Sequence, residues 1–173
     1  MQRYRNGRIV IQEGDITKCA VDALVSPANP SLSPSPQGLD GQIARAAGRE
    51  LDAALRELGG CEPGQAKSTP GFDLAAKIIV HAVSPTWQGG HRDEDQLLEA
   101  CYESALRVAL EHDARSIAIP PLGLRFPKDR AAQIAIASVL DFQEQHPSVE
   151  QVIFCCPTAA DLAVYELAAH EYL

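Results

Sequence analysis

Short apolar runs alternate along this chain with longer segments whose apolar residues recur at helical spacing. Such runs predict buried strands, and the periodic segments predict amphipathic helices. Two parallel strands need a long crossover between them, which is usually a helix. The alternation therefore predicts an α/β fold with a mostly parallel (mixed) sheet and helices on both faces. The expected strands cover residues 21–26, 78–83, 116–119 and 152–156, and the expected helices cover residues 40–58, 93–111, 129–145 and 159–172.

Glycine, proline and asparagine residues mark where these elements stop. Asn6-Gly7 lies between two short segments and predicts a tight hairpin turn near the N-terminus. A stretch rich in proline and serine, residues 30–37, predicts a loop before the helix that begins near Asp40. Gly59-Gly60 predicts the end of that helix.

The length and composition suit one globular domain. The chain has 173 residues, 46% of them hydrophobic, and we expect a single domain over residues 1–173 with a well-buried core. The net charge of −8 is a poor match to a polyphosphate backbone and argues against general nucleic-acid binding. No apolar run approaches membrane-spanning length, and the N-terminus has no signal-peptide core. We therefore expect a cytoplasmic protein without membrane contact, whose oligomeric state stays open.

The cysteines and the histidine inside an expected strand favour structural roles. Five cysteines without a CxxC pair or a Cys/His zinc spacing predict reduced, partly buried thiols and no metal site. Cys155 and Cys156 fit simple strand packing. His81 lies within an apolar run, where a hydrogen-bonded structural imidazole is far more common than a catalytic one.

Three polar side chains stand where strands end or where a helix begins. Asp15 lies in a turn just after an expected strand, Asn29 follows the strand at 21–26, and Asp40 stands near the start of the next helix. Ligands of open α/β sheets bind at the carboxyl ends of the strands. The order of these residues therefore predicts that all three can line one crevice.

Each of the three has a ligand-binding interpretation and a structural one. Asp15 can accept a hydrogen bond from an exocyclic amine such as that of adenine, or can stabilise its own turn. Asn29 can donate to and accept from a ribose hydroxyl, or can satisfy loop backbone. Asp40 can act as a general base, or can cap the helix. Taken singly, the structural role is the commoner one for each residue.

The segment 120–127 joins an expected strand to an expected helix. A loop of this kind can cradle a phosphate with its backbone N–H groups. We therefore count Gly123, Leu124, Arg125 and Phe126 among the candidate ligand-binding residues. Arg125 can add a charge-assisted hydrogen bond, and the alternative is an ordinary solvated surface residue.

Six segments, in this order, resemble the macrodomain family over nearly the whole chain. Gly14–Thr17 is similar to the family's adenine-side motif. Residues 21–29 are similar to its strand ending in Asn-Ala-Ala-Asn, with Ser26-Pro27 in place of the first Asn and an Ala. Residues 38–48 resemble its Gly-Val-Asp-Gly segment and the helix that follows. The remaining matches are residues 77–85, the pair Cys101-Tyr102 and residues 117–123.

The resemblance implies a three-layer α/β/α sandwich with a cleft for ADP-ribose. In the hydrolytic branch of the family, Asn29 would orient a ribose and Asp40 would activate water or the substrate at the distal ribose. The implied activity is removal of ADP-ribose from modified proteins, or hydrolysis of O-acyl-ADP-ribose, without a metal or another cofactor. Two alternatives stay open: a non-catalytic reader of ADP-ribosylated proteins, and a related domain with a changed ligand. The residues implied to contact the ligand are Asp15, Ile16, Ala28, Gly41 and the 123–126 segment.

Two loops and one strand end depart from the family pattern. Residues 34–37, Pro-Ser-Pro-Gln, occupy the region where a glycine run is usual, and the loop at 123–127 is shorter than the family's Gly-rich form. Pro157 stands where an aromatic residue near the adenine is common. Pro34 and Pro36 have no backbone N–H, so fewer donors would face a diphosphate.

Overall fold

A seven-stranded mixed sheet forms the centre of the computed structural model, which describes residues 1–173. The strand order is β1-β2-β7-β6-β3-β5-β4. The edge strands β1 and β4 are antiparallel to their neighbours, and the strands between them run parallel. The predicted mostly parallel sheet is confirmed. The strands are β1 Gln2–Tyr4, β2 Ile9–Glu13, β3 Ala23–Ala28, β4 Ala66–Pro70, β5 Ile78–Val83, β6 Ser116–Ile119 and β7 Gln151–Cys156.

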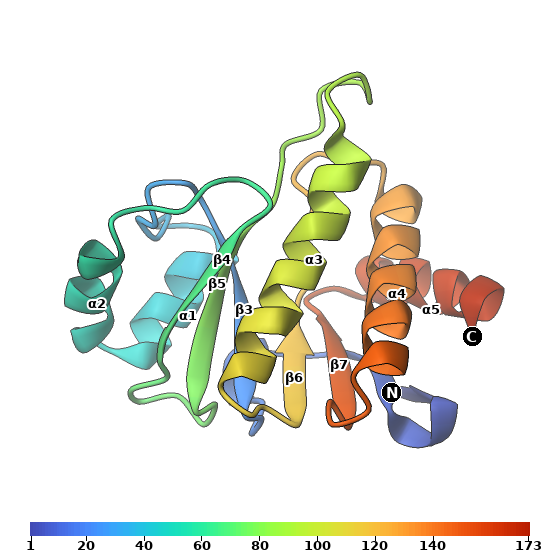
Figure 1. The fold of residues 1–173 in the computed structure, drawn as a ribbon, viewed down its shortest axis with the longest axis horizontal. Coiled ribbons are helices and arrows are strands. Elements are labelled where there is room, and N and C mark those ends of the chain that lie inside the picture. Colours follow the sequence, from blue (N-terminus) through green and yellow to red (C-terminus); the bar gives the residue numbers. More distant parts are fainter.

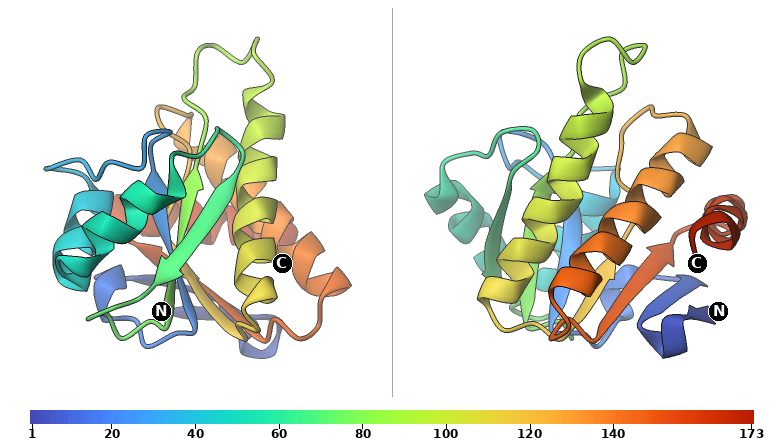
Figure 2. Two further views of the ribbon diagram at one scale, coloured as in Figure 1. Left: turned by 60° about the vertical axis from the view of Figure 1, so that its left-hand side comes forward. Right: turned by 45° about the vertical axis from the view of Figure 1, so that its right-hand side comes forward.

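Helices cover both faces of the sheet and make the expected three-layer α/β/α sandwich (Figure 1). Successive strand side chains point to opposite faces, so Ile79 packs in one apolar core and Val80 in the other. The left view of Figure 2 shows the sheet between the two helical layers. No helix combines the length and apolar character needed to cross a membrane. One layer holds α1 (Leu39–Ala47) and α2 (Glu50–Leu58), and the other holds α3 (Glu94–Glu111), α4 (Lys128–Gln145) and α5 (Ala159–Tyr172).

The expected single helix over residues 40–58 is wrong, because the structure has two helices there. α1 ends at Ala47, and Gly48 takes a φ of +97°, a left-handed value that favours glycine. The backbone N–H of Asp73 donates to the Ala47 carbonyl at 3.1 Å and satisfies one of the free acceptors at the helix end. Apolar periodicity continues across the break because both helices pack on the same core.

The N-terminal hairpin is confirmed, whereas strand β4 has no counterpart in the sequence prediction. Tyr4 pairs with Ile9 across the turn, and Asn6 takes a positive φ there. β4 is mostly polar and ends in Pro70, so it lacks the apolar run by which the other strands were predicted. Its place at the sheet edge, paired only with β5, tolerates a proline.

Candidate functional site

The parallel strands end at one edge of the sheet, and the loops after them hold the predicted site residues. Two neighbouring pockets lie at this edge. The Asp15 pocket is lined by Gly14, Asp15, Ile16, Leu39, Gln42, Cys155 and Pro157. The Asn29–Asp40 pocket is lined by Ser26, Ala28, Asn29, Leu32, Ser33, Pro34, Asp40, Ile43, Leu51, Leu55 and His81.

The start of α1 belongs to both pockets. Leu39 and Gln42 line the Asp15 pocket, and Asp40 and Ile43 line the Asn29–Asp40 pocket. The Gln42 amide also donates to Asp15 Oδ1 at 3.4 Å. The structure therefore brings Asp15, Ile16, Ala28, Asn29 and Asp40 into two adjacent pockets at the start of α1. Gln42 is a site residue that the sequence reasoning missed, since an exposed helical glutamine carries no motif.

Asp15 stabilises its turn and still has an acceptor to offer. Its Oδ1 accepts from the Thr17 N–H at 3.0 Å, and this bond caps the short 3-10 helix Ile16–Lys18. The same oxygen accepts from the Thr17 hydroxyl at 2.6 Å. The hydroxyl bond is the main reason that the pKa of this carboxyl is lowered. All these bonds, including the one from Gln42, fall on Oδ1. Oδ2 is therefore the oxygen available to a ligand in the Asp15 pocket.

Asn29 holds the loop that follows it. Its side-chain amide donates to the Ser33 carbonyl at 2.6 Å, and its Oδ1 accepts from the Ser33 N–H at 3.1 Å and the Ser31 hydroxyl at 2.8 Å. The structural role that the sequence left open is thus present. The same side chain lines the Asn29–Asp40 pocket, together with Ala28 before it.

Asp40 does not cap α1, so the capping alternative is wrong. Gly38 is the N-cap residue, and no side chain caps the helix there. The Asp40 carboxylate instead accepts two hydrogen bonds from Ser35, five residues earlier in the loop. Gly41 is buried, and a Cβ there would lie 1.9 Å from the Ser35 carbonyl oxygen. Glycine at position 41 therefore allows close approach of the loop, and the residue lines neither pocket.

His81 is a buried structural imidazole, as expected. It is 4% exposed, and its Nε2 lies 2.9 Å from the Thr69 hydroxyl of β4. Burial lowers the pKa of His81 to about 4, so the ring is neutral at physiological pH. The ring also lines the Asn29–Asp40 pocket, to which it adds no charge.

The Gly123–Phe126 segment lies at the same sheet edge but lines neither pocket. Gly123 has a φ of +104° and Arg125 a φ of +63°. Leu124 and Arg125 are exposed, whereas Phe126 is buried against Trp87 with ring centroids 5.1 Å apart. The structure thus brings Arg125 to the surface and uses Phe126 as an anchor for the loop.

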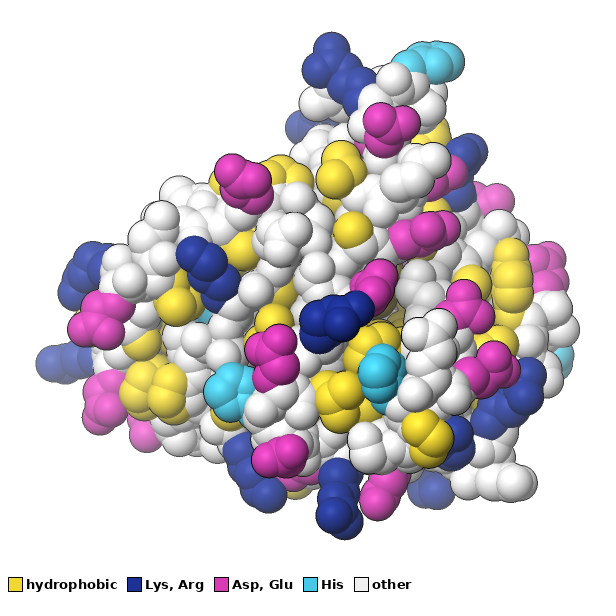
Figure 3. Space-filling model, viewed as in Figure 1, with side chains coloured by type: hydrophobic (Ala, Val, Ile, Leu, Met, Phe, Trp, Pro, Cys, Tyr) yellow, Lys and Arg dark blue, Asp and Glu magenta, His cyan; other side chains and the backbone are white.

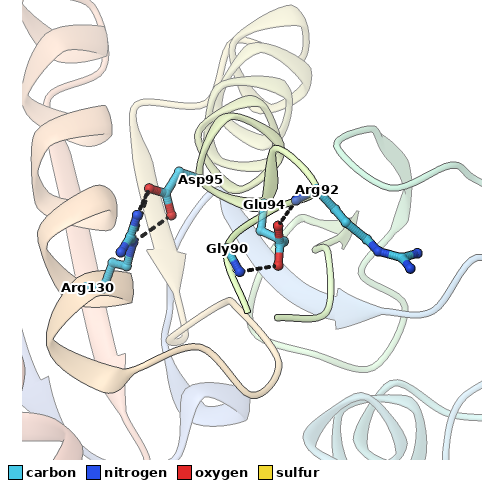
Figure 4. A network of polar contacts seen from close by, with 5 residues as sticks. All are labelled: Gly90, Arg92, Glu94, Asp95 and Arg130. Atoms are coloured by element: carbon cyan, nitrogen blue, oxygen red, sulfur yellow. Dashed lines mark hydrogen bonds and ion pairs between the residues drawn. The ribbon is translucent and has the colours of Figure 1, made fainter. Parts of the chain in front are cut away.

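A buried carboxylate organises the neighbouring loop, which connects β5 to α3. Glu94 accepts from the backbone N–H of Gln88 at 2.8 Å. It also accepts from the backbone N–H groups of Gly90 at 3.0 Å and Arg92 at 2.6 Å (Figure 4). These bonds, the one from Gln88 first, hold the pKa of Glu94 at about 2. Sequence reasoning missed this residue, because a glutamate in a first helical turn is usually solvated.

The β5–α3 loop in turn supports the Gly123–Phe126 segment. The Trp87 N–H donates to the Leu124 carbonyl at 2.9 Å. The Arg130 guanidinium lies 5.0 Å from the centre of the Trp87 ring and also donates to Asp95 at 2.8 Å. Figure 4 shows Arg130 and Asp95 facing one another beside the Glu94 contacts. Noncovalent contacts therefore hold the two loops against one another.

Charged side chains on the face covered by α3 and α4 are of both signs. Figure 3 shows basic and acidic groups interspersed over that face. That face therefore presents no continuous basic patch of the kind that binds nucleic acid.

Comparisons with known proteins agree with this architecture. The family model described as Macro domain matches residues 25–135. The chain is 48% identical over 160 residues to a macro domain-containing protein of Ralstonia nicotianae, covering 91% of each. It is 42% identical over 166 residues to the O-acetyl-ADP-ribose deacetylase of Escherichia coli, covering 92% of this chain and 93% of the relative. The solved Oceanobacillus iheyensis macrodomain with ADP has a TM-score of 0.87 at 30% identity, covering 93% of this chain and 89% of that one.

Proposed function

Because the chain belongs to the macrodomain family, we propose that it binds ADP-ribose across the two pockets and hydrolyses a linkage at the distal ribose. The substrates would be O-acyl-ADP-ribose or an ADP-ribosylated protein. The observation that carries the proposal is the meeting of Asn29 and Asp40 in one pocket, beside the Asp15 pocket and joined to it by α1. Relatives named O-acetyl-ADP-ribose deacetylase, at about 40% identity, support the hydrolytic activity.

In the proposed reaction, Asp40 acts as the general base. Its carboxylate takes a proton from a water whose oxygen attacks the acyl carbon of the ribose ester. The bond from that carbon to the ribose oxygen then breaks, and the oxygen leaves with a proton as a hydroxyl. The products are ADP-ribose and a carboxylic acid, and Asn29 orients the distal ribose by its amide. A positioned base of this kind contributes on the order of 100- to 10,000-fold to the rate.

The main rival is a non-catalytic reader of ADP-ribosylated proteins. The hydrogen bonds between Asn29 and the Ser33 backbone, and those from Ser35 to Asp40, favour it, because they give both side chains a structural role. Release of acetate from O-acetyl-ADP-ribose, measured beside ADP-ribose binding, separates the two. Binding without turnover on the ester or on a modified protein would support the reader. No thermal shift with ADP-ribose would point to a changed ligand.

We expect the adenine amine to donate to Asp15 Oδ2, because the hydrogen bonds to this carboxylate within the protein fall on Oδ1. Asp15→Asn keeps an oxygen that can cap Ile16–Lys18, but an amide at the other position cannot accept from an amine. Losing that charge-assisted bond should weaken ADP-ribose by about 1–3 kcal/mol, measured by calorimetry. Asp15→Ala should weaken it at least as much. Parental affinity in Asp15→Asn, with the fold intact by circular dichroism, would remove Asp15 from the adenine site.

We expect Arg125 to bind a phosphate oxygen. This contact would replace backbone N–H donors that the family's Gly-rich loops offer and that this chain has fewer of. Arg125→Ala should then weaken ADP-ribose by about 1 kcal/mol at low salt, since an exposed charge pair contributes little more. The difference from the parent protein should shrink as salt rises, and Arg125→Lys should rescue only partly. The matched control is Lys128→Ala, which removes an equal charge from an exposed pair with Asp161. Equal affinity of Arg125→Ala and the parent at low salt would contradict the expectation.

A further inference from the structure

Ser35 makes two hydrogen bonds to one carboxylate. Its backbone N–H donates to Asp40 Oδ2 at 2.9 Å, and its hydroxyl donates to Asp40 Oδ1 at 2.5 Å. Both oxygens are therefore held by the same residue, through one rigid backbone atom and one side-chain atom. Two contacts of this kind fix the rotation of the carboxylate plane as well as its place.

The first turn of α1 leaves room for Ser35, because glycines stand at positions 38 and 41. A Cβ at Gly38 would lie 2.3 Å from the Ser35 hydroxyl, and one at Gly41 would lie 1.9 Å from its carbonyl oxygen. On the other side, the Arg45 guanidinium donates to the Pro36 carbonyl at 3.0 Å. Helix α1 thus holds the loop around Ser35 at several points.

The prolines on each side restrict the same residue. Pro34 and Pro36 have fixed φ angles, and a residue before proline is confined to extended conformations. Ser35 lies between them, so its backbone has little freedom. The two prolines supply no N–H groups to a diphosphate, but they present Ser35 in a fixed position.

Ser35 approaches Asp40 from outside the pocket. Asp40 lines the Asn29–Asp40 pocket, whereas Ser35 lines a separate surface hollow beside Gly41 and Arg45. A ligand in the pocket does not need to displace Ser35. Each carboxylate oxygen has a further lone pair, which can face the pocket while the Ser35 bonds persist.

We infer that Ser35 is the positioning residue for Asp40, and that its two bonds orient the carboxylate toward the distal ribose and the attacking water. The inference rests on the proposed function, because it gives the oriented carboxylate its catalytic role. The two bonds serve no cap of α1, since Gly38 occupies that position. Small misplacements of a catalytic group lower rates steeply, so the orientation has a measurable effect.

The test uses the full chain with O-acetyl-ADP-ribose as substrate and ADP-ribose as the binding probe. Ser35→Ala should lower kcat by about 10- to 100-fold, with KM and the Kd of ADP-ribose within about threefold of the parent. Ser35→Thr keeps the hydroxyl and should restore most of kcat. Gln37→Ala, an exposed change in the same loop that lines neither pocket, should match the parent. In an Asp40→Asn background, Ser35→Ala should cause no further loss, because Ser35 acts through the carboxylate.

Parental kcat in Ser35→Ala would overturn the inference, and so would equal loss in the alanine and threonine variants. Failure of the proposed hydrolysis gives a different result, a parent protein that binds ADP-ribose but turns over no ester. In that case, crystal structures of the parent and Ser35→Ala with ADP-ribose decide the positioning role. We expect the Asp40 side chain to have a different orientation in Ser35→Ala, which lacks the hydroxyl. An unchanged orientation would refute it.

Discussion

Replacement of Asp40 by alanine is expected to lower turnover of O-acetyl-ADP-ribose on the order of 100- to 10,000-fold, the contribution of a positioned general base. Binding of ADP-ribose should change far less, because the Asp15 pocket and most of the Asn29–Asp40 pocket stay intact. The measurements are kcat by product release and Kd by calorimetry. A loss that appears mainly in Kd would assign Asp40 to binding and not to the chemical step.

Asp40→Asn separates the charge of the side chain from its volume. The amide keeps the size of the carboxylate but cannot take a proton from water, so kcat should fall nearly as far as in the alanine variant. Asp52→Asn, the same change at an exposed position on α2, serves as the matched control and should keep parental turnover. Near-parental turnover in Asp40→Asn would count against the catalytic role.

The stability of the protein should fall as pH drops from about 6.5 to about 4, because His81 is buried in its neutral form. In the unfolded chain, a histidine takes up a proton near pH 6.5, whereas the folded protein resists that proton until about pH 4. The unfolded state therefore binds more protons within this window, and acid favours it. Each pKa unit corresponds to about 1.4 kcal/mol, so the loss at pH 4 is about 3 kcal/mol from this group.

The measurement is urea unfolding of the parent and of His81→Gln across that pH range. Glutamine can still bond to the Thr69 hydroxyl but does not titrate, so the variant should lack this part of the acid destabilisation. The control is His112→Gln, which removes an exposed imidazole bonded to Ser68 of the same strand. Identical pH dependence in the parent and His81→Gln would show that His81 does not cause the loss.

Much of the fold was predictable because it depends on local patterns. The apolar runs at β5, β6 and β7 and the long periodic segments at α3, α4 and α5 specify strands and helices without reference to the rest of the chain. Helix α1 shows the limit of that reasoning. Its end depends on a left-handed Gly48 and on a bond from Asp73, a residue far along the chain.

The candidate site was predictable as a set of positions but not as a set of contacts. The order of strands and loops brings Asp15, Asn29 and Asp40 to one edge of the sheet. That Asp40 would meet Ser35, or that Phe126 would turn inward onto Trp87, follows from no spacing in the sequence. Such contacts depend on how separate segments fold back onto α1 and onto each other.

By itself, the sequence determined the layered α/β architecture, the macrodomain motifs and the sheet edge at which the predicted site residues lie. Hydrophobic periodicity and turn residues act over a few neighbouring positions, so they can be seen in one dimension. Only the tertiary structure decided which oxygen of Asp15 stays open, which residue orients Asp40, and how Glu94 fixes the loop beside the Gly123–Phe126 segment. Those outcomes depend on hydrogen-bond geometry and burial, which exist only once distant parts of the chain are packed together.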